Sequence, residues 1–154
     1  MTFWLRTGGL CSRRLLLALL PLLVLVGCDN RPLRVPVSGQ VLIDGTPLGY
    51  GDVQILPAGA RPAYGRLDEN GRFTLMTFDN EDGCVPGTHK VAVISRKILS
   101  ATSQQWLAPK IYSDPEQTPL EVTVDETTEN LTIELSWSAD PLHRGPFIER
   151  FDAE

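Results

Sequence analysis

Cysteine and histidine are scarce in this chain of 154 residues, which holds three cysteines and two histidines. Cys11 and Cys28 lie near the start, so beyond them only Cys84 remains and no intrachain disulfide can form there. His89 and His143 are the only side chains with an ordinary pKa near neutrality. The Gly-x-Ser-x-Gly, His-Glu-x-x-His, Cys-x-x-Cys and P-loop patterns are absent. We therefore predict no catalytic residues, no metal site and no cofactor.

Positive charge is sparse beyond Cys28. Three of the 14 basic residues precede Cys28 (Arg6, Arg13 and Arg14), whereas all 19 acidic residues follow it. Residues 28–154 therefore hold 11 basic and 19 acidic groups, a net charge of about −8. Such a surface repels phosphate backbones, so nucleic acid is not an expected partner. It also repels anionic lipid, so membrane attachment would need a source other than charge.

The apolar run from Leu15 to Val26 is too short for a membrane-spanning helix, which needs about 20 apolar residues. A basic start, a short apolar segment and a small residue are typical of an export signal. The segment Leu25-Val26-Gly27-Cys28 resembles the bacterial lipobox. That resemblance implies cleavage after Gly27 and a lipid on the Cys28 thiol. The alternative is an ordinary signal peptide or anchor with an incidental cysteine.

The lipobox resemblance sets the expected organisation of the chain. Residues 1–27 are predicted to be a lipoprotein signal peptide, and residues 28–34 an acylated N-terminus and linker. The protein is then expected to be a lipoprotein anchored in a membrane of the cell envelope through the lipid on Cys28. The choice between the inner and the outer membrane stays open.

Short stretches with apolar residues at every second position dominate the rest of the chain, and no sustained helical period occurs. Asp44-Gly45 and Asn70-Gly71 are signals for tight turns, and Gly39 indicates a bulge or a close backbone approach. We therefore predict an all-β domain over residues 35–137, a seven-stranded antiparallel β-sandwich of transthyretin-like or Ig-like type. The predicted strands are 35–43, 53–55, 63–68, 72–78, 90–93, 120–124 and 131–135.

Residues 98–118 do not alternate and are expected to form a long loop, with one helical turn near Ser103 to Leu107. Trp106 and Tyr112 in this loop are candidate ligand-binding residues, because loops on a rigid sandwich often bind ligands and aromatic rings stack on sugars. Residues 138–154 hold Pro141, Gly145 and Pro146 and are predicted to be a flexible C-terminal extension.

Several segments, in this order and spacing, resemble carboxypeptidase regulatory-like domains, which have a transthyretin-like or prealbumin-like sandwich. The resemblance covers roughly Val35 to Leu135, and its segments are 37–41, 44–48, 68–73, 85–91, 109–115 and 119–124. In metallocarboxypeptidases this domain is a non-catalytic appendage. A hydrolase of related fold ends in Tyr-Arg-Gly-Ser, whereas this chain ends in Phe-Asp-Ala-Glu. Other relatives bind starch or form stalks, so the fold does not select a function.

The remaining polar features are expected to have structural roles. The acidic loop 79–83 lacks the spacing of a calcium-binding loop and is expected to be a solvated turn. His89 is expected to make a structural polar contact, and Cys84 to be a buried, inert thiol. The leading functional prediction is a non-enzymatic envelope module that contacts protein or glycan. Its alternatives are a carbohydrate- or small-ligand-binding protein using the 98–118 loop, and a hydrolase of unrecognised mechanism.

Overall fold

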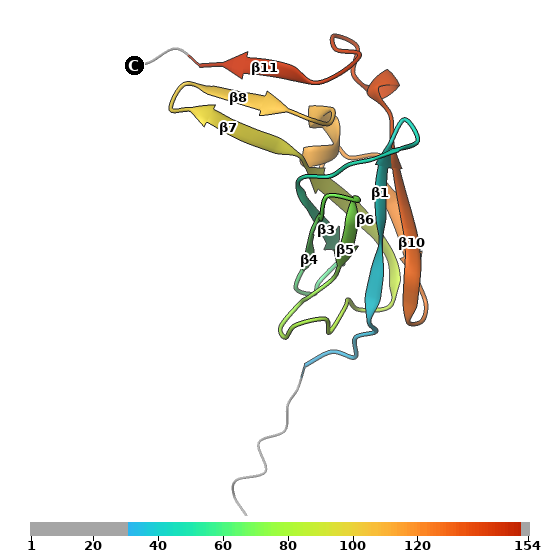
Figure 1. Ribbon diagram of the computed structural model, residues 1–154. Coiled ribbons are helices and arrows are strands. Elements are labelled where there is room, and N and C mark those ends of the chain that lie inside the picture. Colours follow the sequence, from blue (N-terminus) through green and yellow to red (C-terminus); the bar gives the residue numbers. More distant parts are fainter. Residues whose placement is uncertain (1–30, 152–154) are drawn as a thin grey trace, which may run out of the picture. The chain divides into compact units, whose positions relative to one another are not determined.

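The computed structural model describes residues 31–151, so the predicted signal peptide, Gly27 and Cys28 lie outside the described part of the chain. The described fold belongs to a unit that begins at Pro32 (Figure 1). It is mostly β, as predicted, with eleven strands and two short 3-10 segments between residues 31 and 151. No helix in these residues is long and apolar enough to cross a membrane.

Two sheets form the main body of the domain. In the first, β1 pairs with β10, β2 and β5; in the second, the order is β4-β3-β6-β9 with antiparallel neighbours. The strands of the first sheet are β1 (Val37–Ile43), β2 (Thr46–Pro47), β5 (Arg72–Thr74) and β10 (Thr128–Leu135). Those of the second are β3 (Asp52–Leu56), β4 (Ala63–Arg66), β6 (Gly87–Ile94) and β9 (Glu121–Val124).

All seven predicted strands are present in these two sheets, but their pairing is not wholly antiparallel. β1 and β10 run parallel, with Val41 beside Ile133 and Ile43 beside Leu135. Alternation of apolar residues reports which face of a strand is buried and carries no information on the direction of its neighbour. The prediction of an entirely antiparallel sandwich is therefore wrong at this pair.

The two sheets share one hydrophobic core. Val37 and Val41 of β1 contribute to it from the first sheet, and Val53, Ile55 and Val91 contribute from the second, each at most 1% exposed. Burial of such side chains stabilises a fold by about 1.5–3 kcal/mol each. The core therefore holds the two sheets face to face and leaves the alternate side chains of each strand outside.

Both glycine signals in the sequence correspond to backbone features that need them. Asp44 and Gly45 have φ angles of 45° and 79° and join β1 to β2, as a two-residue turn with left-handed backbone requires. At Gly39 the pairing of β1 with β10 shifts register, and an added Cβ would collide with the backbone of Leu131. The predicted tight turn and close approach are confirmed.

The turn at Asn70-Gly71 is also present, although it joins strands of different sheets. The Gly71 N–H donates to the Asp68 carbonyl at 2.9 Å, and Gly71 has a φ of 71°. On either side of this turn, β4 pairs with β3 and β5 pairs with β1. A single antiparallel bridge between Tyr64 and Met76 still links the two arms. This hairpin therefore closes one side of the core by crossing from one sheet to the other.

A third sheet, with the order β11-β8-β7, contains segments that were predicted as loops. It consists of β7 (Arg96–Ser100), β8 (Ser103–Trp106) and β11 (Phe147–Arg150). The predicted helical turn near Ser103 to Leu107 is wrong, because these residues include β8. The predicted flexible extension is wrong for residues 147–150, which pair with β8 along its length. The 3-10 segments η2 (Lys110–Ser113) and η3 (Trp137–Ala139) connect this sheet to the main body.

Candidate ligand groove

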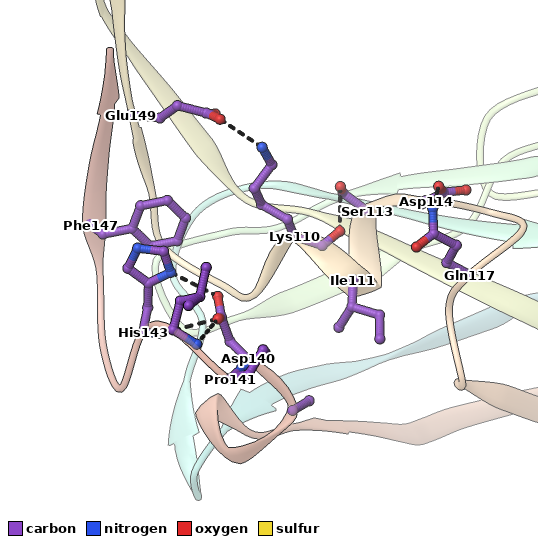
Figure 2. Close-up of a pocket in the computed structure, with 12 residues that line it drawn as sticks. Lys110, Ile111, Ser113, Asp114, Gln117, Asp140, Pro141, His143, Phe147 and Glu149 are labelled. Atoms are coloured by element: carbon purple, nitrogen blue, oxygen red, sulfur yellow. Dashed lines mark hydrogen bonds and ion pairs between the residues drawn. The ribbon is translucent and has the colours of Figure 1, made fainter.

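A groove of about 560 Å³ lies between η2 and the C-terminal segment that leads into β11 (Figure 2). Figure 2 shows Phe147 and His143 on one side of it and Lys110 and Ile111 on the other. Its apolar lining comes from Ile111, Ala139, Pro141, Leu142 and Phe147, and its polar rim from Lys110, Asp114, Asp140, His143 and Glu149. The groove thus combines residues of the predicted 98–118 loop with residues of the predicted tail.

Glu149 on β11 connects three elements around the groove. Its Oε2 accepts hydrogen bonds from Trp106 Nε1 and Gln104 Nε2, both at 2.8 Å, and its Oε1 accepts one from Lys110 Nζ at 2.7 Å. The hydrogen bonds from Lys110, Trp106 and Gln104 lower the pKa of Glu149 to about 2. The carboxylate therefore stays charged and holds β8, β11 and η2 together.

Trp106 is buried beneath this network. Its side chain is 5% exposed, and the cations of Arg96 and Lys110 lie 5.8 and 5.4 Å from its ring centre. The two cations contact the ring and the Glu149 carboxylate bonds to the indole nitrogen. A ring in this position offers no open face to a sugar. The contacts of Trp106 therefore favour a structural role over the predicted stacking role.

Tyr112 is equally buried, at 5% exposure. Its hydroxyl donates to the Ser136 carbonyl at 3.3 Å and accepts from the Ser136 N–H at 3.2 Å. Ser136 directly follows β10, so this pair of hydrogen bonds fixes η2 to the end of the main body. Neither Tyr112 nor Trp106 lines the groove, although both position residues that do.

A turn from Asp140 to His143 forms the second wall. Asp140 Oδ1 accepts hydrogen bonds from the N–H groups of Leu142 and His143, and Oδ2 lies 3.1 Å from His143 Nδ1. Burial opposes ionisation of Asp140, but these hydrogen bonds and the neighbouring His143 keep its pKa below the usual value. The His143 ring stacks on Phe147 with 3.6 Å between ring centres. The Asp-x-x-His spacing was the only sequence signal for this wall.

His89 and Cys84 lie away from the groove. His89 is 8% exposed and its Nε2 lies 2.7 Å from the Val85 carbonyl oxygen, which is the structural contact predicted for it. Cys84 is completely buried, as predicted, and burial raises the pKa of its thiol to about 11. A thiol in that state is protonated and unreactive at neutral pH.

The acidic loop is organised around Asp82. Its carboxylate oxygens accept hydrogen bonds from the N–H groups of Thr77, Phe78 and Asp79, and Oδ2 lies 2.8 Å from Arg34 Nε. Burial opposes ionisation of Asp82, but these hydrogen bonds and the charge of Arg34 keep its pKa below the usual value. The side chain is therefore used to close the loop and to hold Arg34.

No family model, no curated protein and no solved structure matches the chain.

Proposed function

We propose that this protein is a lipid-anchored, non-enzymatic module of the bacterial cell envelope. In this proposal a carboxypeptidase regulatory-like, transthyretin-like sandwich is tethered at Cys28 and contacts a protein or glycan partner through the groove. The lipobox segment supports the anchor. The position of the groove relative to the start of the folded domain supports its role as the contact site.

The start of the folded domain is fixed by two contacts. Arg34 is paired with Asp82 as described above, and Val35 forms an antiparallel bridge with Cys84 through hydrogen bonds of 2.9 and 3.1 Å. Arg34 lies six residues after Cys28. Because an extended chain spans at most about 3.3–3.6 Å per residue, a lipid on Cys28 would keep this end of the domain within about 20 Å of its membrane attachment.

The groove lies at the other end of β1 and β10. These parallel strands run together from Val37 and Thr128 to Ile43 and Leu135. Beyond Leu135 the chain enters η3 and the Asp140 turn, which line the groove. A strand rises about 3.3 Å per residue, so β1 separates the two ends by about 20 Å (Figure 1). This separation is the observation that carries the proposal, because a tethered domain presents its distal end to partners.

The side chains around the groove favour binding over catalysis. Lys110 is paired with Glu149, and His143 with Asp140. The Ser113 hydroxyl donates to the Lys110 carbonyl at 2.7 Å, so the serine in the groove is not paired with the histidine. An activated nucleophile needs a base within hydrogen-bond reach. Lys110 and Glu149 are instead paired with each other, and His143 with Asp140. The Asp114 carboxylate accepts hydrogen bonds from the Glu116 N–H and the Gln117 amide, so each of these groups already has a bonding partner.

The anchor is tested by replacing the cysteine that would carry the lipid. Cys28→Ala should move the protein from the membrane fraction to the soluble fraction, because two or more acyl chains are needed for stable attachment and none would be added. Cys11→Ala is the matched control and should leave the protein in the membrane fraction. Equal membrane association of both variants would argue against acylation at Cys28.

The contact site is tested by crosslinking in intact cells. A photo-activated amino acid at Leu142, which is 83% exposed and lines the groove, should give discrete adducts with an envelope component. The control position is Thr132, an exposed residue in the middle of β10 that does not line the groove. Adducts of the same kind and yield from both positions would contradict a contact site in the groove.

A second candidate function is small-ligand binding in the same groove. It is favoured by one observation: Lys110, Ile111 and Asp114 of the predicted 98–118 loop line a half-apolar hollow of small-molecule size. A screen of neutral oligosaccharides against the wild type and Ile111→Asp tests it. Ligands that bind the wild type and lose binding in Ile111→Asp would favour this function, and binding unchanged by the substitution would exclude the groove as its site.

A further inference from the structure

A second cleft, of about 600 Å³, lies over the outer face of the β4–β5 hairpin. Its lining includes Arg66, Arg72, Thr74, Ser38 and Met76. A smaller hollow of about 350 Å³ shares Arg66 and Met76 with it and continues toward Tyr64 and Gln54. None of these residues lines the groove beside η2, so the two sites are separate.

The register of the strands brings the two arginines of this cleft together. The bridge between Tyr64 and Met76 and the hydrogen bond from the Asp68 N–H to the Arg72 carbonyl place Arg66 opposite Thr74. Arg72 is two residues from Thr74 on the same strand and is therefore the diagonal neighbour of Arg66. Diagonal neighbours lie about 7–8 Å apart, and both side chains project outward. Two guanidinium groups can therefore reach one bound group.

Neither arginine forms an ion pair with a carboxylate of the described residues. Asp52 is the register partner of Arg66 across β3 and β4, yet the ion pairs within residues 31–151 do not include Arg66 or Arg72. Asp68, also in the cleft, uses its Oδ1 to accept hydrogen bonds from the N–H groups of Asn70 and Arg72, both at 2.8 Å. Guanidinium groups bind carboxylates through two parallel hydrogen bonds. The cleft therefore offers a carboxylate two guanidinium groups that have no ion-pair partner.

The rest of the lining suits a sugar ring. Tyr64 and Met76 are 44% and 47% exposed beside Arg66, which provides an apolar platform for the C–H face of a pyranose. Ser38 and Thr74 face each other across β1 and β5, and their hydroxyls can bond to sugar hydroxyls. Asp68 and Glu81 also line the cleft and would repel a ligand with a high density of negative charge.

We propose that this cleft binds one uronic acid unit of an envelope polysaccharide, a sugar ring that carries a single carboxylate and can belong to a longer chain. Arg66 and Arg72 donate hydrogen bonds to the carboxylate, and Tyr64 packs on the ring. This site does not depend on the groove, and its binding in solution does not depend on the lipid anchor. Failure of one proposal is therefore distinguishable from failure of the other.

The test measures binding of trigalacturonic acid to the full chain in detergent by calorimetry. Its methyl ester is the neutral probe, and triglutamate is a peptide with the same number of side-chain carboxylates. The acid should bind, whereas the ester and the peptide should bind at least about tenfold more weakly, as expected for the loss of a charged hydrogen-bond pair or of the sugar ring. Equal binding of the ester or of the peptide, or no binding of the acid, would overturn the proposal.

Variants locate the binding on the protein. Arg66→Gln and Arg72→Gln should each weaken binding of the acid about tenfold or more. Arg144→Gln and Arg150→Gln are the matched controls, because these two arginines lie outside the cleft, and both should bind as the wild type does. Tyr64→Ala should weaken binding of acid and ester alike. Equal losses in the control variants, or wild-type binding by both Arg66→Gln and Arg72→Gln with circular dichroism unchanged, would rule out this cleft.

Discussion

Glu149 is the residue on which the third sheet most depends, because its carboxylate bonds to Gln104, Trp106 and Lys110 on β8 and beyond. Glu149→Gln keeps the shape of the side chain and removes the charge. The side chain is 26% exposed, so solvent screens part of the interaction and we expect a loss of about 1 kcal/mol. The measurement is amide hydrogen exchange in β8 and β11, which should accelerate in this variant.

The control for this substitution is Glu134→Gln, whose exposed carboxylate lies on β10.

The pH dependence of the fold follows from the lowered pKa of Glu149. Its stabilising contribution is present above pH 4.5, its ordinary pKa, and is lost as the pH falls toward 2. After correction for the pH dependence of intrinsic exchange, the protection of the β11 amides should therefore fall across that range in the wild type, and fall less in Glu149→Gln. Equal acid sensitivity of the two proteins would contradict the role given to the charge.

Gly39 is required by packing. An added Cβ would collide with the backbone of Leu131 on the neighbouring strand, which cannot move without disturbing the parallel pair. Gly39→Ala should lower the free energy of unfolding by about 1–3 kcal/mol or more, the cost typical of overpacking. Denaturant titration measures this loss. Gly145→Ala has open space around its Cβ and should cost little, so similar losses in the two variants would argue against the close approach.

Cys84 should be inert in the folded protein. Its thiol is completely buried and its pKa is raised to about 11, so little thiolate forms at neutral pH. A maleimide should therefore modify Cys84 slowly in buffer and rapidly in denaturant, as peptide mass analysis can follow. Rapid modification at residue 84 under native conditions would show that the pairing of Val35 with Cys84 opens readily.

At this scale the sequence predicts local geometry well and distant partners poorly. Asp44-Gly45 and Gly39 could be interpreted correctly because a positive φ angle or a missing side chain is a property of one or two residues. The hydrogen bond between Lys110 and Glu149 joins residues 39 positions apart, and the sequence of neither segment predicts it. For the same reason the sequence identifies the Trp106 ring as a candidate binding residue but does not show which distant residues bury it.

The element scale shows the same division between local and distant information. The seven strands with one apolar buried face in the two main sheets were all predicted, since apolar alternation reports burial. β7 has five exposed residues, and β8 is the polar segment Ser-Gln-Gln-Trp, so neither alternates in the usual way. β7 and β8 are strands because they pair with each other and because β8 pairs with β11. The sequence of a single segment does not reveal such pairing with a distant one. The groove was missed because it requires this third sheet.

The C-terminal segment should be part of the fold. Ending the chain after Asp140 removes β11, including Phe147 and Glu149, and exposes the indole of Trp106. The tryptophan fluorescence should shift to longer wavelength while the β-type circular dichroism persists, because the core of the two main sheets does not use these residues. The shift should become smaller when Trp106→Phe is combined with the truncation. The remainder comes from Trp137, which loses its edge-to-face contact with Phe147. An unchanged spectrum after truncation would indicate that β11 is not held against β8.

At the scale of the whole molecule, charge is distributed unevenly along the chain. Residues 114–140 hold eight acidic groups and no basic ones. Two of these, Asp125 and Glu126, lie on the connection from β9 to β10, and Glu129 is the second residue of β10, which begins beside Val37. Anionic lipid headgroups would repel this end. In the proposed anchored state the acidic connection would therefore keep the domain off the bilayer surface and leave the distal groove accessible.

The tether at Cys28 is the claim on which this orientation depends, and mass spectrometry of the native protein tests it most directly. The proposal predicts an N-terminal peptide that begins at Cys28 and carries the mass of a diacylglyceryl group, with no peptide that joins Gly27 to Cys28. A native protein that retains residues upstream of an unmodified Cys28 would contradict it.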